Sequence, residues 1–267
     1  MSLHLVHFFG KSLGMENTFY ALVPEMDGPF SVLYLLHGLG DDCSAYLRRT
    51  GLDRYLAGQK LIVVMPTGGR SWYANDPSPG GLAYEDHIVR DLVEYVDRTF
   101  HTRPSRANRA IAGLSMGGFG AIMLAMRHPR VFSIACSHSG ALLTGPVRHP
   151  IKEDVQLFLD QLPQPAYDIF ELAKAFCPAD ESKLRKGRGQ RVADQGEPVD
   201  SPVDITPHLY MDCGQDDQML KPNQAFHEHL EQLEIAHEYH EFPGAHDWMY
   251  WDEHLRDSLA FVLAHVE

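Results

Sequence analysis

The chain has 267 residues, of which 44% are hydrophobic and 22% charged, an ordinary globular composition that excludes a disordered chain, a collagen-like repeat and a coiled coil. The 23 basic and 36 acidic side chains give a formal net charge of −13. Because so acidic a surface repels phosphate groups, we expect neither nucleic acid nor an anionic membrane as a partner.

The first part of the chain predicts four strands, over Leu3–Phe8, Thr18–Val23, Ser31–Leu36 and Leu61–Met65. The first two are separated by a turn region and are typical of an antiparallel pair. The last two are apolar without alternation, which is typical of strands buried on both faces of a parallel sheet. Apolar residues at helical spacing predict a helix over Tyr46–Ala57, ended by Gly58, and an amphipathic helix over Tyr84–Phe100.

The rest of the chain continues the alternation. Further strands are predicted over Arg109–Ala112, Phe132–Ser137, His208–Asp212 and His237–Phe242, and helices over Gly117–Arg127, Asn223–Leu233 and Glu253–His265. Strands that alternate with helices imply right-handed crossovers. The sequence therefore predicts a single α/β domain over residues 1–267, with a mostly parallel twisted sheet and helices on both faces.

One stretch, residues 141–206, breaks this rhythm. It contains many prolines, a basic run at Lys183–Arg188, and helical patches at Val155–Leu162 and Ile169–Phe176. Long loops in compact domains are usually functional or disordered. We interpret the stretch as a small cap insertion over the edge of the sheet that holds the active site. The alternative is a solvent-exposed loop without function.

The strongest chemical motif is Gly113-Leu114-Ser115-Met116-Gly117, which matches G-x-S-x-G. A predicted strand precedes it and a predicted helix follows, as a nucleophile elbow requires. A turn into an ordinary helix would be the structural alternative. In a nucleophile elbow, the backbone N–H of the residue after the serine is one donor of the oxyanion hole, and here that residue is Met116.

A serine hydroxyl needs a base, which we place late in the chain. His246 lies in a loop after a predicted strand, whereas several other histidines fall within predicted strands or helices. Three carboxylates compete to orient it. Asp212 is at the end of the strand itself, and spacing alone leaves Asp216 and Asp217 open.

The loop at His37–Gly40 follows a buried strand, and its glycines allow the backbone to turn inward as the second oxyanion donor. A simple strand-ending turn is the alternative, and His37 is expected to be a structural hydrogen-bonding residue. Trp72, Tyr73 and Trp248 either wall an acyl or leaving-group pocket or pack in the core.

The four cysteines are far apart and form no C-x-x-C motif, so we expect no disulfide and a cytoplasmic location. Met1–Gly10 shows no signal-peptide pattern, and no apolar run approaches the about 20 residues of a spanning helix. Histidine pairs occur without an H-E-x-x-H motif, so no metal site is expected. Cys43 is either a packed small residue or a source of thiol sensitivity.

Four segments together resemble the esterase D family of α/β-hydrolases: Leu35–Gly38, Gly113–Ala121, Cys213–Asp217 and His246–Trp251. That family includes S-formylglutathione hydrolases, tributyrin-type esterases and mycolyltransferases. The resemblance implies an α/β-hydrolase fold, Asp217 as the acid, the Leu39 N–H as the second oxyanion donor, and a homo-oligomer.

We therefore expect a serine carboxylesterase that hydrolyses small, short-acyl esters without a cofactor, through Ser115, His246 and Asp217. S-formylglutathione thioesters and sugar esters are the alternative substrates. A non-catalytic binding protein that kept the fold is the alternative of another class, but such a homologue would usually lack one of the three residues.

Overall fold

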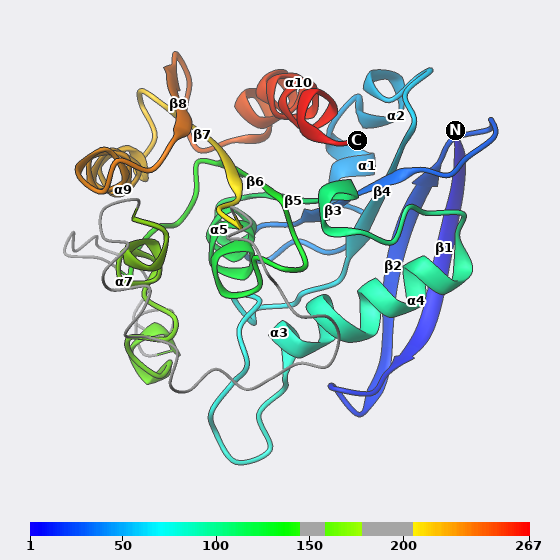
Figure 1. The fold of residues 1–267 in the computed structure, drawn as a ribbon, viewed down its shortest axis with the longest axis horizontal. Helices are drawn as coiled ribbons and strands as arrows, with labels where there is room; N and C mark the ends of the chain where they lie inside the picture. Colours follow the sequence, from blue (N-terminus) through cyan, green and yellow to red (C-terminus); the bar gives the residue numbers. More distant parts are fainter. Residues whose placement is uncertain (145–157, 178–204) are drawn as a thin grey trace, which may run out of the picture.

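The computed structural model describes residues 1–144, 158–177 and 205–267. An eight-stranded sheet runs through the protein, in the order β1-β2-β4-β3-β5-β6-β7-β8 (Figure 1). The strands are β1 (Ser2–Gly10), β2 (Met15–Val23), β3 (Ser31–Leu36), β4 (Leu61–Pro66), β5 (Arg109–Leu114), β6 (Ile134–His138), β7 (His208–Gly214) and β8 (His237–Phe242). All of them lie within a few residues of the predicted positions.

The strand directions follow from the hydrophobic patterns. The strand β2 runs antiparallel to both of its neighbours, and the strands from β4 to β8 are parallel. Every residue of β3 and β4 is buried, which explains why their sequences are apolar without alternation. The predicted fold class, a mostly parallel α/β sheet, is confirmed.

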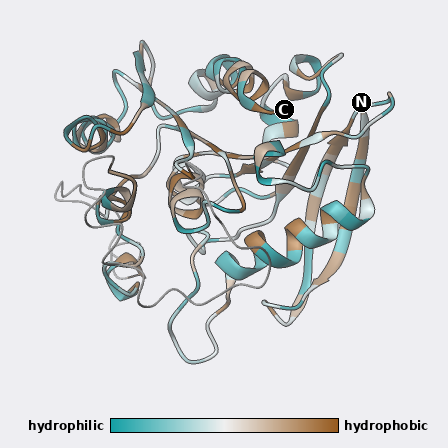
Figure 2. Cartoon of the chain, viewed as in Figure 1, coloured by the Kyte–Doolittle hydropathy of each residue, from teal (hydrophilic) through white to brown (hydrophobic). Residues whose placement is uncertain are grey.

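Helices cover both faces of this sheet (Figure 1). One apolar cluster joins the sheet to α1 (Ala45–Arg49), α2 (Leu52–Tyr55) and α10 (Trp248–His265). The other joins it to the second group of helices: η1 (His87–Leu92), α4 (Val93–Thr99), α5 (Met116–Arg127), α7 (Ile169–Ala173) and α9 (Leu220–Gln232). Hydrophobic and hydrophilic bands alternate along α4 in Figure 2, as expected for a helix with one buried face. Three further short helical elements are α3 (Tyr84–Asp86), η2 (Arg106–Asn108) and η3 (Lys174–Phe176).

The single helix predicted over Tyr46–Ala57 is wrong, because the chain breaks between α1 and α2. Thr50 is extended, with φ −129° and ψ 169°. The next N–H, that of Gly51, donates to the Asp252 carboxylate of α10 at 2.8 Å. The Thr50 hydroxyl accepts the Leu52 N–H at 3.2 Å, so a local bond and a contact between residues 201 positions apart both hold the break.

Two other helices differ in detail from the prediction. The helix over Tyr84–Phe100 exists, but its middle, η1, is a π-helical stretch of six residues. The last helix begins at Trp248 rather than at Glu253. Asp247 caps it, because its carboxylate accepts the N–H groups of Met249 and Tyr250 at 2.9 and 3.1 Å.

Much of the predicted cap, including the basic run Lys183–Arg188, lies outside the described residues. Residues 158–161 are helical, and α7 with η3 covers the second predicted patch. The described part packs against α5 and α9, and its apolar side chains belong to the same cluster as those of α5.

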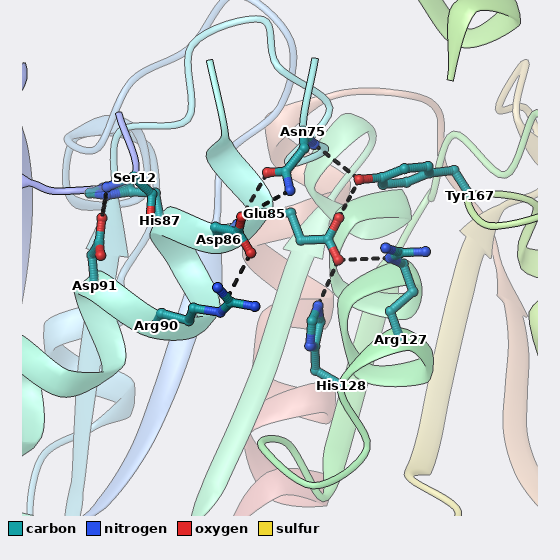
Figure 3. Close-up of polar contacts among 10 residues, drawn as sticks. All are labelled: Ser12, Asn75, Glu85, Asp86, His87, Arg90, Asp91, Arg127, His128 and Tyr167. Carbon is teal, nitrogen blue, oxygen red and sulfur yellow. Dashed lines mark hydrogen bonds and ion pairs between the residues drawn. The ribbon is translucent and has the colours of Figure 1, made fainter. Parts of the chain in front are cut away.

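A buried carboxylate ties this part to the body of the protein (Figure 3). Glu85, at the start of α3, is 1% exposed. Its carboxylate accepts hydrogen bonds from Arg127 Nε at 2.7 Å, from His128 Nε2 at 2.6 Å, and from the Tyr167 hydroxyl. The Arg127 guanidinium also lies 4.2 Å from the centre of the Tyr167 ring. One charge thus holds together α3, the end of α5 and the described insertion.

We expect the Glu85 carboxylate to make stability depend on acid pH. Burial alone would raise the pKa of Glu85, but hydrogen bonds from His128, Arg127 and Tyr167 outweigh burial and lower the pKa from 4.5 to about 2. The contribution is present above pH 4.5, because the carboxylate is then ionised in both states, and is lost as the pH falls towards 2. Urea titrations should show that the free energy of unfolding of the wild type, relative to Glu85→Gln, falls by about 2 kcal/mol between pH 6 and pH 3. An unchanged difference over that range would contradict this prediction.

Candidate active site

Ser115 lies in a sharp turn between β5 and α5. Its backbone has φ 53° and ψ −117°, a region that residues other than glycine rarely adopt and that is often found at functional sites. Two hydrogen bonds hold the turn: the Ser115 N–H donates to the His138 carbonyl at 3.0 Å, and the Ser115 carbonyl accepts the Ala141 N–H at 2.9 Å. The turn thereby has the geometry expected of a nucleophile elbow.

Close backbone packing explains both glycines of the motif. A Cβ atom on Gly113 would lie within 3.0 Å of the Gly117 backbone, and one on Gly117 would lie within 3.0 Å of the carbonyl of Leu36. Real Cβ atoms do not come that close, so β3, β5 and the start of α5 could not pack as they do with larger residues. The two glycines let Ser115 lie close to the end of β3.

The side chains of Ser115, His246 and Asp217 form one line of hydrogen bonds. His246 Nε2 lies 3.0 Å from Ser115 Oγ, and His246 Nδ1 lies 2.9 and 2.8 Å from the two Asp217 carboxylate oxygens. Because a carboxylate can only accept, the proton is assigned to Nδ1, which leaves the Nε2 lone pair facing the serine. The Asp217 side chain is fully buried, whereas that of His246 is 20% exposed.

Contacts between two loops bring Asp217 and His246 together. The loop after β7 bonds to the loop after β8, with Gln215 N–H on the Phe242 carbonyl at 2.8 Å and Asp216 N–H on the Gly244 carbonyl at 2.9 Å. In this arrangement the Asp216 side chain is exposed. Asp217 points inward, where it also accepts the Met219 N–H at 2.7 Å.

Asp212, the third candidate from the sequence, does not contact His246. It is fully buried and bonds instead to His138 and Tyr250. Sequence reasoning missed this second set of contacts. The only local signal was a carboxylate at the end of a buried strand, and its partner His138 is 74 residues away.

The His37–Gly40 loop lies beside Ser115. A Cβ atom on Gly38 would be 3.6 Å from the Ser115 Cβ. Both nitrogens of His37 are committed to the backbone: Nδ1–H donates to the Gly38 carbonyl at 2.8 Å, and Nε2 accepts the Gly68 N–H at 2.9 Å. Burial lowers the pKa of His37, which favours this neutral form. The imidazole therefore has the structural role expected of it.

The two predicted oxyanion donors come from different elements. Met116 is the first residue of α5, where a backbone N–H has no acceptor within its helix and where the helix dipole favours negative charge. Leu39 is partly buried in the loop beside Ser115.

The three predicted pocket aromatics have packing roles. Tyr73 has no exposed surface, and its hydroxyl donates to the His37 carbonyl at 3.0 Å. Trp72 is 4% exposed and packs edge-on against Phe119. These positions favour the core alternative for both residues. Trp248 is partly buried at the first position of α10, where it packs edge-on against Tyr46 and Trp251.

All four cysteines are free. Burial raises the pKa of the Cys43 thiol, which disfavours the reactive thiolate. In residues 1–144, 158–177 and 205–267, no group of three or more His, Cys, Asp or Glu side chains could hold a metal ion. Within the same ranges, no helix combines the length and the apolar character needed to cross a membrane.

The parallel sheet and the serine at its strand–helix turn define an α/β-hydrolase. The Esterase family, described as "Putative esterase", matches residues 10–262. The chain therefore belongs to this family, in agreement with the family expected from its motifs.

Individual relatives agree with this assignment. Esterase Rv1288 of Mycobacterium tuberculosis is 29% identical over 236 residues, which are 81% of this chain and 48% of that protein; the chain thus spans about half of its length. An acetyl esterase of Caldicellulosiruptor saccharolyticus is 22% identical over 284 residues, covering 98% of each chain. The fold matches that of FphF, a fluorophosphonate-binding serine hydrolase of Staphylococcus aureus, with a TM-score of 0.79, 23% identity and 98% of each chain covered.

Proposed function

We propose that this esterase is a serine carboxylesterase that hydrolyses small, short-acyl esters through an acyl-enzyme intermediate. The observation that carries the proposal is the position of His246, whose imidazole bonds to Ser115 Oγ on one side and to the Asp217 carboxylate on the other. A nucleophile, a base and a group that orients the base are the components that acyl transfer requires.

In the first half of the reaction, Ser115 Oγ attacks the ester carbonyl carbon while His246 Nε2 accepts the hydroxyl proton. Asp217 keeps the proton of the imidazole on Nδ1 and stabilises the imidazolium that forms. The tetrahedral intermediate then collapses, and His246 gives the proton to the departing alcohol. In the second half, His246 Nε2 takes a proton from water as the water attacks the acyl carbon. The bond between the acyl carbon and Ser115 Oγ then breaks, the acid is released, and His246 returns the proton to Ser115 Oγ.

The negative charge on the intermediate requires preorganised donors. We assign these to the backbone N–H groups of Leu39, in the loop beside Ser115, and of Met116, at the start of α5. In related chemistry, losing one donor of this kind costs about 3 kcal/mol in the barrier. The contacts of His37 with Gly38 and Gly68 support the donor loop before substrate arrives.

A panel of esters tests the substrate class. We expect kcat/KM for p-nitrophenyl acetate and butyrate to exceed that for the octanoate. The acetyl esterase relative supports a short acyl group. Preference for S-formylglutathione over all three esters would favour thioester hydrolysis, and preference for acetylated sugars would favour a deacetylase. Absence of turnover on every member of the panel would contradict the esterase proposal.

A further inference from the structure

A second buried polar network lies behind Ser115, outside the line formed with His246. The Asp212 carboxylate, at the end of β7, accepts from His138 Nδ1 at 2.7 Å with one oxygen and from the Tyr250 hydroxyl at 3.0 Å with the other. His138 Nε2 lies 2.7 Å from Ser258 Oγ. Asp212, His138, Tyr250 and Ser258 are each at most 3% exposed. The network therefore joins β6, β7 and α10 in the interior.

The His138 side of this network reaches Ser115 through the backbone. The His138 carbonyl accepts the Ser115 N–H, and the Ala141 N–H donates to the Ser115 carbonyl, so residues 138–141 hold Ser115 from both sides. The same segment is fixed to Asp212 twice: by the His138 imidazole, and by the Ser139 N–H, which donates to the Asp212 carbonyl at 2.8 Å. The unusual backbone angles of Ser115 are thus maintained by a segment that Asp212 anchors.

The Tyr250 side reaches His246. Tyr250 is in the first turn of α10, where its N–H bonds to the Asp247 cap. Its ring packs closely on Gly244, two residues before His246: a Cβ atom on Gly244 would be 2.6 Å from Tyr250 Cδ2. The hydroxyl bond to Asp212 thus fixes the ring on which the His246 loop rests.

We propose, building on the function proposed above, that Asp212 is a positioning residue that sets the separation between Ser115 Oγ and His246 Nε2. One carboxylate oxygen holds the segment behind the nucleophile, and the other holds the ring beneath the base. Asp212 bonds to neither Ser115 nor His246, so it acts only through His138, Ser139 and Tyr250. A displacement of about 1 Å between reacting groups can reduce the rate about 100-fold, so a rigid internal tie between the two loops has a direct catalytic consequence.

Tyr250→Phe tests the proposal with the loss of one oxygen atom. We expect kcat for p-nitrophenyl acetate to fall about tenfold while KM changes less than about twofold, because the reacting groups and not the substrate contacts are displaced. Rates are to be expressed per active site titrated with an organophosphate. The matched control is Tyr34→Phe: Tyr34 is fully buried, and its hydroxyl has no hydrogen-bond partner among the described residues. This control should retain the wild-type kcat.

Asp212→Asn is the second variant. The amide has one acceptor oxygen instead of two and carries no charge, so Tyr250 or His138 can keep its contact only by accepting from the amide nitrogen, and both contacts become weaker. We expect a decrease in kcat of about tenfold. A role in folding alone would lower the melting temperature and leave kcat per titrated site unchanged. A Tyr250→Phe enzyme with the same kcat per site as Tyr34→Phe would overturn the proposal, even if Asp212→Asn does not fold. Failure of the esterase proposal would be distinct, since the wild type itself would then be inactive.

Discussion

Replacing Ser115 with alanine is expected to lower kcat for p-nitrophenyl acetate by about a millionfold. The hydroxyl is the atom that His246 Nε2 faces at 3.0 Å, and no acyl-enzyme can form without it. The remaining oxyanion donors and substrate contacts can still assist attack by water, so a small rate above background is expected. Stopped assays over hours, with the variant purified separately from any wild-type enzyme, measure such a rate.

Ser137→Ala is the matched control for this loss. Ser137 is a fully buried serine on the neighbouring strand β6, and its Oγ has no hydrogen-bond partner among the described residues. Its replacement removes the same atom and should leave kcat within about twofold of the wild type. If Ser115→Ala kept more than a hundredth of the wild-type rate, Ser115 would not be the nucleophile.

Replacing Asp217 with asparagine is expected to lower kcat by about 10⁴-fold, with a much smaller effect on folding. The carboxylate accepts the hydrogen bond of His246 Nδ1–H with both oxygens. An asparagine amide turned towards the imidazole favours the other tautomer, whose Nε2 carries a proton and cannot accept one from Ser115. The comparison of kcat for the wild type and the variant at pH 8 measures the effect.

Asp216→Asn provides the control, because it makes the same chemical change on the adjacent residue. The Asp216 side chain is exposed, and its backbone N–H, which bonds to Gly244, is unaffected by the substitution. We therefore expect kcat within about twofold of the wild type. Equal losses from the two substitutions would overturn the assignment of the acid to Asp217.

Local patterns were sufficient to predict most of the fold. The strands β3 and β4 are buried on both faces, so their side chains are apolar at every position and the pattern can be recognised directly. The break between α1 and α2 was missed because the apolar spacing continues across it. The Thr50 hydroxyl, which accepts the Leu52 N–H at 3.2 Å, was a local signal, and only the bond to Asp252 comes from a distant helix. The start of α10 did have a local signal, the Asp247 cap, which the apolar spacing further along the helix obscured.

Part of the candidate site could also be predicted from local sequence patterns. Ser115 and His246 could be located because each lies in a loop directly after a strand, with a recognisable neighbourhood. Asp216 and Asp217 are adjacent, and only the path of the turn decides which side chain points inward; the family resemblance, not the spacing, favoured Asp217. The packing of Tyr73 depends on its distant contact with the His37 carbonyl, which no spacing predicts.

The separation of 131 residues between Ser115 and His246 has a consequence for biosynthesis. While the ribosome is still translating the second half of the chain, the nucleophile has no base, so the nascent polypeptide cannot hydrolyse esters. The apolar residues of α10, among them Trp251 and Leu255, cover one side of the sheet together with α1 and α2, and they are synthesised after all eight strands. Until they emerge, part of that side stays exposed to solvent and to chaperones, so the site is completed at about the stage of synthesis at which this part of the core is covered.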